Sequence, residues 1–175
     1  MPVLLHICCA PCSAACVQSL RGESLELLGF WYNPNIHPFT EYAARRGALD
    51  GYAETIGLPL VTRDGYGLRD FLANVPVDAE ARCAACYAMR MDAAALTAAE
   101  RGCEAFTTTL LISPYQRHEL LRETAEAAAK RHGVAFLYRD FRPRFREGQD
   151  AARELGLYRQ KYCGCIFSEE ERYAR

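Results

Sequence analysis

Residues 3–13 carry the sequence VLLHICCAPCS. A mostly apolar run, Val3 to Ile7, ends at two adjacent cysteines, and small residues predominate from Ser13 to Leu20, after a third cysteine. A short apolar run that ends in a proline-containing loop is typical of a buried strand, and a segment of small residues suits a helix packed closely on it. This stretch therefore predicts the strand, loop and helix with which an α/β fold begins.

The same alternation continues along the chain. We expect further strands at 25–32, 60–62, 105–111 and 135–138, and helices at 40–56, 68–73, 83–101, 117–132 and 148–155. Strands that alternate with helices predict a mostly parallel sheet with helices on both faces. We expect residues 1–175 to form a single α/β domain with a cysteine-containing C-terminal extension. Ligands of such sheets bind beyond the carboxyl ends of strands, here the loops after Ile7, Tyr32 and Leu111.

Composition excludes several classes of protein. Half of the 175 residues are hydrophobic and a quarter are charged, a balance typical of folded chains and not of disordered ones. The formal net charge of −1 gives no global attraction to nucleic acid or membrane, so a polyanion would need a local basic patch. The start lacks the pattern of a secretion signal, and no window approaches the ~18 apolar residues of a membrane span. We expect a cytoplasmic protein without a membrane partner.

The nine cysteines are the most informative residues. Cys16, one turn after Cys12, and Cys103, before a buried strand, are explained by packing, since free cysteine is often buried. The other seven form three clusters: Cys8, Cys9 and Cys12; Cys83 and Cys86; and Cys163 and Cys165, with Gly164 between the last two. In a reducing compartment such clusters indicate metal binding or thiol chemistry.

The position of each cluster favours thiolate chemistry. Cys8 and Cys9 close a strand and Cys12 opens a helix, so the positive helix end is expected to lower the pKa of all three thiols. Adjacent side chains on an extended backbone point apart, which predicts that Cys8 and Cys9 serve two neighbouring centres. Cys83 and Cys86 are three residues apart near a predicted helix start, where both sulfurs can face one metal or cluster.

Three chemistries remain open from these residues alone. A structural zinc site in a nucleic-acid-binding protein would use four ligands and leave three cysteines without a role. A thiol-disulfide oxidoreductase would use Cys9 and Cys12, whose spacing after a strand matches a thioredoxin-type motif. An iron–sulfur centre employs the most thiols, and the surplus over four suggests a second metal or a redox-active pair.

Six segments together resemble the cobalamin-independent epoxyqueuosine reductases, the QueH family. They are LLHICCAPCS (4–13), FWYNPNIHPFTEY (30–42), RCAACYAMR (82–90), FTTTLLISPYQRHEL (106–120), FLYRDFRPRFREGQ (136–149) and GLYRQKYCGCIFSEEE (156–171). The resemblance implies a PP-loop-like (HUP-like, Rossmann-like) fold and an oxidoreductase with a 4Fe-4S cluster and an adjacent mononuclear iron. It also implies that the substrate is epoxyqueuosine at the wobble position of tRNA, reduced to queuosine with electrons from an external donor.

The resemblance also leads us to assign roles to the cysteines. We expect Cys9, Cys83 and Cys86 to hold the cluster, and Cys8 and Cys12 to help bind the second iron. Cys163 and Cys165 are then further metal ligands or a redox pair. Because cysteines occupy the turn that binds nucleotide phosphate in PP-loop relatives, we do not expect ATP to be used.

Polar and basic residues supply candidates for substrate binding. Thr108, Ser113 and Tyr115 follow a predicted strand, where hydroxyls and a ring could hold an unstacked base, and we assign Tyr115 a catalytic role with Cys8 and Cys12. Residues 139–161 hold seven basic and four acidic residues with aromatics between them, a composition suited to RNA, and Arg142 and Arg144 are the predicted tRNA contacts. For Asn33 and Asn35 a role in the turn is as well supported as ligand contact. His37 could donate a proton, although a lone histidine seldom does.

Overall fold

The computed structural model describes residues 1–174 as an α/β fold. The strands are β1 (Val3–His6), β2 (Leu27–Trp31), β3 (Leu60–Thr62), β4 (Ala105–Thr108) and β5 (Ala135–Phe136). The helices are α1 (Ala10–Gly22), α2 (Phe39–Thr55), α3 (Leu68–Asn74), α4 (Ala79–Glu100), α5 (His118–His132), α6 (Phe145–Glu154) and α7 (Ile166–Tyr173). Short 3-10 helices, η1 (Thr109–Ile112) and η2 (Arg142–Arg144), follow β4 and precede α6.

All five strands are parallel, in the order β3-β2-β1-β4-β5. β1 is central, and His6 at its end is paired with Phe30 of β2 on one side and Thr108 of β4 on the other. The chain therefore winds outward in one direction from β1 and in the other from β4. The crevice between the carboxyl ends of β1 and β4 is the switch point at which doubly wound sheets bind their ligands.

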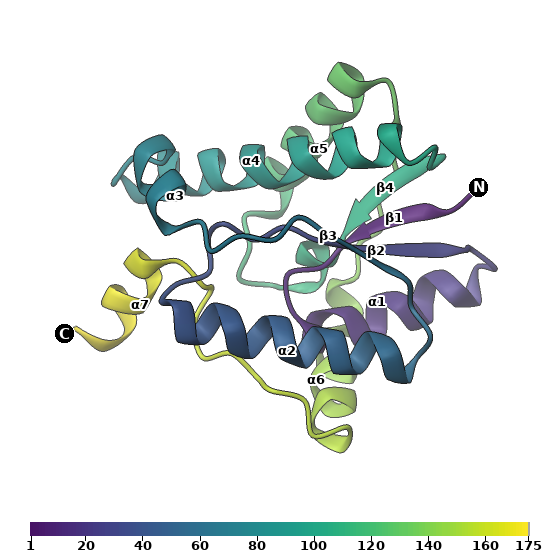
Figure 1. Cartoon of the computed structure of the whole chain (residues 1–175), viewed down its shortest axis with the longest axis horizontal. Coiled ribbons are helices and arrows are strands. Elements are labelled where there is room, and N and C mark those ends of the chain that lie inside the picture. The colour runs from purple at the N-terminus through teal and green to yellow at the C-terminus, as the bar shows by residue number, and fades with distance from the viewer. Residues whose placement is uncertain (175) are drawn as a thin grey trace.

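Helices cover both faces of the sheet, as the alternating pattern predicts (Figure 1). α4 and α5 lie side by side on one face, and α1, α2 and α6 lie on the other. After α6 the chain runs back past α2 and ends at α7, near α3 (Figure 1). We call residues 157–174 the C-terminal segment. Within residues 1–174, no helix is long and apolar enough to cross a membrane.

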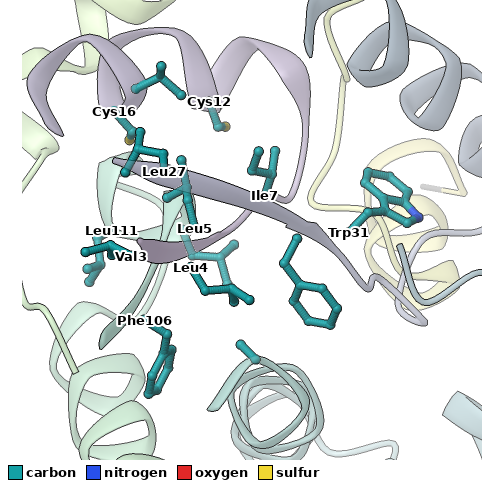
Figure 2. Close-up of a cluster of buried hydrophobic side chains, with 14 of the residues drawn as sticks. Val3, Leu4, Leu5, Ile7, Cys12, Cys16, Leu27, Trp31, Phe106 and Leu111 are labelled. Atoms are coloured by element: carbon teal, nitrogen blue, oxygen red, sulfur yellow. The ribbon is translucent and has the colours of Figure 1, made fainter. Parts of the chain in front are cut away.

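The core is built on β1 (Figure 2). Val3, Leu4 and Leu5 are at most 1% exposed because both neighbouring strands and both helical layers cover them. Cys16 on α1 is fully buried in this cluster, and Cys103 is 7% exposed beside β4. The packing role predicted for these two cysteines is confirmed.

Two boundaries differ from the prediction, for local reasons. The strand predicted at 105–111 stops at Thr108, because the Thr108 hydroxyl accepts a hydrogen bond from the Leu110 amide at 3.2 Å and the chain turns into η1. The helix predicted to begin at Cys83 begins at Ala79, because the Asp78 carboxylate caps it by accepting from the Ala81 amide at 3.0 Å. Cys83 and Cys86 consequently lie in the second turn of α4 rather than at its start.

Near the C-terminus the structure adds elements that the sequence pattern did not predict. α6 begins at Phe145, three residues before the predicted start, and Arg142 and Arg144 lie in the η2 turn that leads into it. Helix α7 was not predicted, and Cys165 is its N-cap residue, with Sγ accepting a hydrogen bond from the Ser168 amide at 3.3 Å. The second cysteine pair is thus placed where the C-terminal segment turns into a helix.

Candidate active site

The site begins at the switch point between β1 and β4. Cys8 lies just beyond the end of β1, and its amide donates to the Thr109 hydroxyl at 3.1 Å. The same hydroxyl lies 3.2 Å from Cys8 Sγ. Asn33, after β2, donates from Nδ2 to the Ile7 carbonyl at 2.9 Å. The loops after three neighbouring strands thereby hold the CCAPC turn in place.

Cys8, Cys9 and Cys12 form a sulfur triad, with ligand atoms all within 4.8 Å of one another. The Sγ atoms of Cys8 and Cys9 are 3.8 Å apart. The expectation that these adjacent side chains point apart was wrong, because β1 ends at His6 and Cys9 is already the N-cap residue of α1. The backbone of Cys9 is itself extended, but the chain bends at Cys8, so the regular strand on which the argument depended does not continue through the pair.

The three thiols differ in their acidity. Hydrogen bonds from Cys12 and Cys9 hold the pKa of the Cys8 thiol well below its usual value, helped by the charge of Arg90. Burial raises the pKa of Cys9, and the Cys8 and Cys9 thiols, together with burial, raise that of Cys12. A lowered pKa, predicted for all three thiols, is therefore found only for Cys8, where the neighbouring thiols and Arg90 cause it rather than the helix end. Cys8 is the first of the three thiols to lose its proton.

A single cavity of about 720 Å³ joins the three cysteine clusters. Its lining includes six of the seven clustered cysteines: Cys8, Cys12, Cys83, Cys86, Cys163 and Cys165. Cys9 is not in the lining, but its sulfur accepts a hydrogen bond at 3.0 Å from Nε2 of Gln160, a residue of the C-terminal segment. Segments far apart in the sequence thus deliver their sulfurs to one place.

Arg45 of α2 holds the second cysteine pair at the cavity. Its side chain is 2% exposed and donates to the carbonyls of Cys163 at 2.9 Å and Tyr162 at 3.0 Å. Gly164 has φ of +144°, and a Cβ there would lie 3.2 Å from the Arg45 guanidinium. The turn between the two cysteines therefore requires glycine for its backbone conformation and for its close approach to Arg45.

His37 has a structural role rather than that of a proton donor. Its ring is fully buried, with Nε2 2.8 Å from the Pro34 carbonyl and Nδ1 accepting from the Ile166 amide at 3.1 Å. Its own amide donates to the Gly164 carbonyl at 2.8 Å. Both ring nitrogens are therefore occupied, and the ring fastens the start of α7 to the loop after β2.

Of the three residues predicted to bind substrate at the end of β4 or beyond it, two line the cavity and one does not. Ser113 and Tyr115 line the cavity, and the Tyr115 side chain is exposed, with its ring packed edge-on against Phe145. Thr108 is fully buried, and its hydroxyl is engaged by the His6 ring at 2.9 Å. Thr108 therefore does not reach the cavity, because β4 ends there and the chain turns inward.

The predicted arginines also lie away from the cavity. Arg142 forms a two-bond ion pair with the neighbouring Asp140. Arg144 pairs with Glu147 and donates to the Ala15 carbonyl at 3.1 Å, which fastens α6 to α1. Their alternate spacing falls in the η2 turn, so these side chains serve local contacts.

Other cations take their place around the cavity. Among residues 1–174 its lining contains eight basic side chains, namely Arg45, Arg82, Arg90, Arg117, Arg153, Arg159, Lys161 and Arg172. A single acidic residue, Glu171, accompanies them. Four of the eight, Arg45, Arg82, Arg117 and Arg153, pair with carboxylates, and within residues 1–174 the other four form no ion pair, so positive charge remains at the cavity despite the net charge of −1.

Sequence reasoning missed Gln160, Arg45 and Arg90. A usable signal existed for Gln160 alone, since it lies three residues before Cys163. Arg45 and Arg90 are ordinary helix residues in sequence, and arginine at such positions is usually exposed. Their burial follows from tertiary contacts.

This arrangement defines a class of protein: a doubly wound α/β fold whose switch point carries cysteine side chains suited to a metal or cluster. A family model described as epoxyqueuosine reductase QueH matches residues 3–171. An epoxyqueuosine reductase QueH of Dehalococcoides mccartyi is 39% identical over 173 residues, covering 99% of this chain and 95% of that protein. Those of Thermotoga maritima and Acinetobacter baylyi are 34% and 33% identical, covering 97% and 95% of this chain and 91% and 79% of theirs.

The chain therefore belongs to the epoxyqueuosine reductase QueH family, whose members are named for an oxidoreductase activity. Of the three chemistries left open by the cysteines, family membership favours the reductase over the thiol-disulfide enzyme and the zinc-stabilised nucleic-acid binder. It also confirms the resemblance carried by the six sequence segments.

Proposed function

We propose that this chain reduces the epoxide of epoxyqueuosine at the wobble position of tRNA to give queuosine, using a 4Fe-4S cluster and an adjacent mononuclear iron. The observation that carries the proposal is the cavity, which brings six cysteines from three segments together with eight basic side chains. The names of the relatives supply the reaction. Thiolate chemistry requires a reducing compartment such as the cytoplasm, where we expect the enzyme to act.

The residues present fit such a group. Thiolates are the ligands that iron and iron–sulfur clusters prefer, and the triad already brings three sulfurs within 4.8 Å of one another. Cys9, Cys83 and Cys86 would hold the cluster, and Cys8 and Cys12 the second iron. Cys163 and Cys165 would be further ligands or a redox pair. Because Cys9 touches Cys8, the two centres would be immediate neighbours.

Epoxide removal has simple requirements. Converting the epoxide to a carbon–carbon double bond takes two electrons and two protons and releases the oxygen as water. The bound metals would supply single electrons and polarise the epoxide oxygen. Tyr115 and Ser113 present hydroxyls at the cavity, and we assign Tyr115 the transfer of a proton from its phenol oxygen. An external donor must supply the electrons.

The basic residues at the cavity support binding of the tRNA substrate. Arg159 and Lys161 line the cavity and form no ion pair within residues 1–174, so they would meet phosphates flanking the modified nucleotide, whereas Arg153 pairs with Asp150. Tyr115 and Phe145 offer rings on which an unstacked base can lie. The cysteines line a cavity rather than a protruding surface, which is consistent with a nucleotide that leaves its stack to reach them.

The proposal is tested by turnover. Protein reconstituted anaerobically with iron and sulfide is incubated with tRNA that contains epoxyqueuosine and a reductant, and the tRNA is digested and analysed for queuosine. We expect queuosine to form and the reconstituted protein to hold more than four irons per chain. Stoichiometric zinc without sulfide, or no queuosine from a fully loaded protein, would refute the assignment.

A further inference from the structure

Arg90 is an arginine in the interior of the protein. It lies on α4, one turn after Cys86, and is 1% exposed. One terminal nitrogen donates to the Asn33 side-chain oxygen at 2.8 Å, and the other lies 4.0 Å from Cys86 Sγ. Its Nε is buried without a hydrogen-bond partner. Arg90 also lines the cavity, together with six of the clustered cysteines.

Arg90 differs from the other buried arginines in its lack of a carboxylate. Arg45 pairs with Glu41 and Arg82 with Glu171, whereas no acidic side chain pairs with Arg90 in residues 1–174. An unpaired buried charge costs several kcal/mol, which folded proteins avoid by supplying a counter-charge. The fold therefore holds a positive charge whose partner is not an Asp or Glu.

Sulfur is the remaining source of negative charge. The titratable groups on which the Arg90 charge acts are His6, Cys8, Cys86 and Cys163, which come from β1, the loop after it, α4 and the C-terminal segment. His6 is fully buried, and both its ring nitrogens are engaged, at 2.9 and 3.1 Å. It cannot neutralise a cation. The sulfurs of Cys8, Cys86 and Cys163, which line the same cavity as Arg90, can do so once a bound metal holds them as thiolates.

We propose that Arg90 compensates the negative charge of the thiolate-bound centre and raises its reduction potential. The inference rests on the proposed function, since it needs a metal centre at these cysteines. Each thiolate ligand adds a negative charge to the centre, and each electron that the centre accepts adds another negative charge. A fixed cation nearby attracts this charge and therefore makes electron uptake more favourable. Asn33 fixes the guanidinium in place and links it to the Ile7 carbonyl at the end of β1.

The test compares reduction potentials of loaded proteins. Arg90→Met keeps an unbranched side chain that fills part of the space and removes the charge, Arg90→Lys keeps the charge, and Arg101→Met removes an exposed charge at the end of the same helix. Each is titrated anaerobically and followed by visible absorbance and electron paramagnetic resonance. We expect the one-electron reduction equilibrium of Arg90→Met to fall by roughly tenfold, about 59 mV. Arg90→Lys should restore most of the lost reduction potential, and the reduction potential of Arg101→Met should equal that of the native chain.

An Arg90→Met potential equal to the native value would overturn the inference, as would a lysine variant no better than methionine. A native protein that holds no iron and sulfide would instead refute the proposed function.

A second measurement addresses folding. Without metal, Arg90→Met should resist denaturant at least as well as the native chain, because it removes an unpaired buried charge. If the metal-free variant fails to fold, Arg90 is a structural tie to Asn33 and the inference is wrong.

Discussion

Replacing Arg45 by methionine removes the guanidinium that fastens the C-terminal segment to α2. The change deletes two hydrogen bonds, to the carbonyls of Cys163 and Tyr162, at 2.9 and 3.0 Å. It also removes the ion-pair partner, at 2.8 Å, of Glu41, whose side chain is 10% exposed and still accepts a hydrogen bond from the Tyr158 hydroxyl. Hydrogen bonds from a charged donor contribute about 1.5–3 kcal/mol each, and methionine retains part of the packing.

The net loss is about 3 kcal/mol, and it falls on the C-terminal segment rather than on the sheet. Because 1.4 kcal/mol corresponds to a factor of ten, local opening of this segment should become roughly 100-fold more frequent. Hydrogen exchange measured by mass spectrometry distinguishes opening of the C-terminal segment from opening of the sheet, if peptides covering residues 160–168 and β1 are compared. We expect faster exchange in the first peptide and unchanged exchange in β1.

Arg46→Met provides the matched control. Arg46 is the next residue on α2, but its partners Asp50 and Asp64 are at the surface. Exposed ion pairs contribute little, so this variant should leave exchange of the C-terminal segment unchanged. Equal protection of residues 160–168 in Arg45→Met and the native chain would refute the claim that Arg45 holds the second cysteine pair.

Three further predictions concern RNA binding, pH dependence and the core. Arg159→Ala with Lys161→Ala should weaken tRNA binding and lower the slope of log affinity against log salt by about 0.7–0.9 for each phosphate that is no longer neutralised; a fall seen only with Arg142→Ala and Arg144→Ala would return the RNA contact to the arginines predicted from sequence. Burial lowers the pKa of His37 from its ordinary value of 6.5, so the unfolded chain binds more protons as the pH falls below 6.5. The stability that this ring contributes is thus complete above pH 6.5 and declines below it. The free energy of unfolding should therefore differ less between pH 7.5 and pH 5.5 for His37→Gln than for the native chain, as measured by denaturant unfolding. Cys16→Ala should cost about 1 kcal/mol in denaturant unfolding and leave the iron and sulfide content unchanged, because Cys16 is a core residue; loss of iron would make it a ligand.

Features set by neighbouring residues were predictable from the sequence. The apolar run at Val3 and the CCAPC turn predict β1 and the start of α1, and alternation predicts the parallel sheet with two helical layers. The seven clustered cysteines could be separated from Cys16 and Cys103 because Cys16 lies within a helix of small residues and Cys103 precedes a buried strand. These inferences rest on spacing within one turn or strand.

Features that depend on contacts between distant segments were not predictable. Gln160 reaches Cys9 across 151 positions, and Arg45 reaches Cys163 across 118. Local composition favoured Arg142 and Arg144, but each forms an ion pair with an acidic residue two or three positions away. The prediction for Thr108 was wrong because nothing in a threonine run shows where a strand ends and which hydroxyl turns inward.

The most direct test of the central claim compares Cys8→Ala with Cys16→Ala in epoxyqueuosine turnover. Both remove a sulfur near the start of the chain, but Cys8 lines the cavity and Cys16 is enclosed in the core. After anaerobic reconstitution and incubation with substrate tRNA and reductant, Cys16→Ala should yield queuosine at close to the native rate and Cys8→Ala should yield none. Queuosine formation by Cys8→Ala at the native rate would contradict the assignment of the chemistry to this cavity.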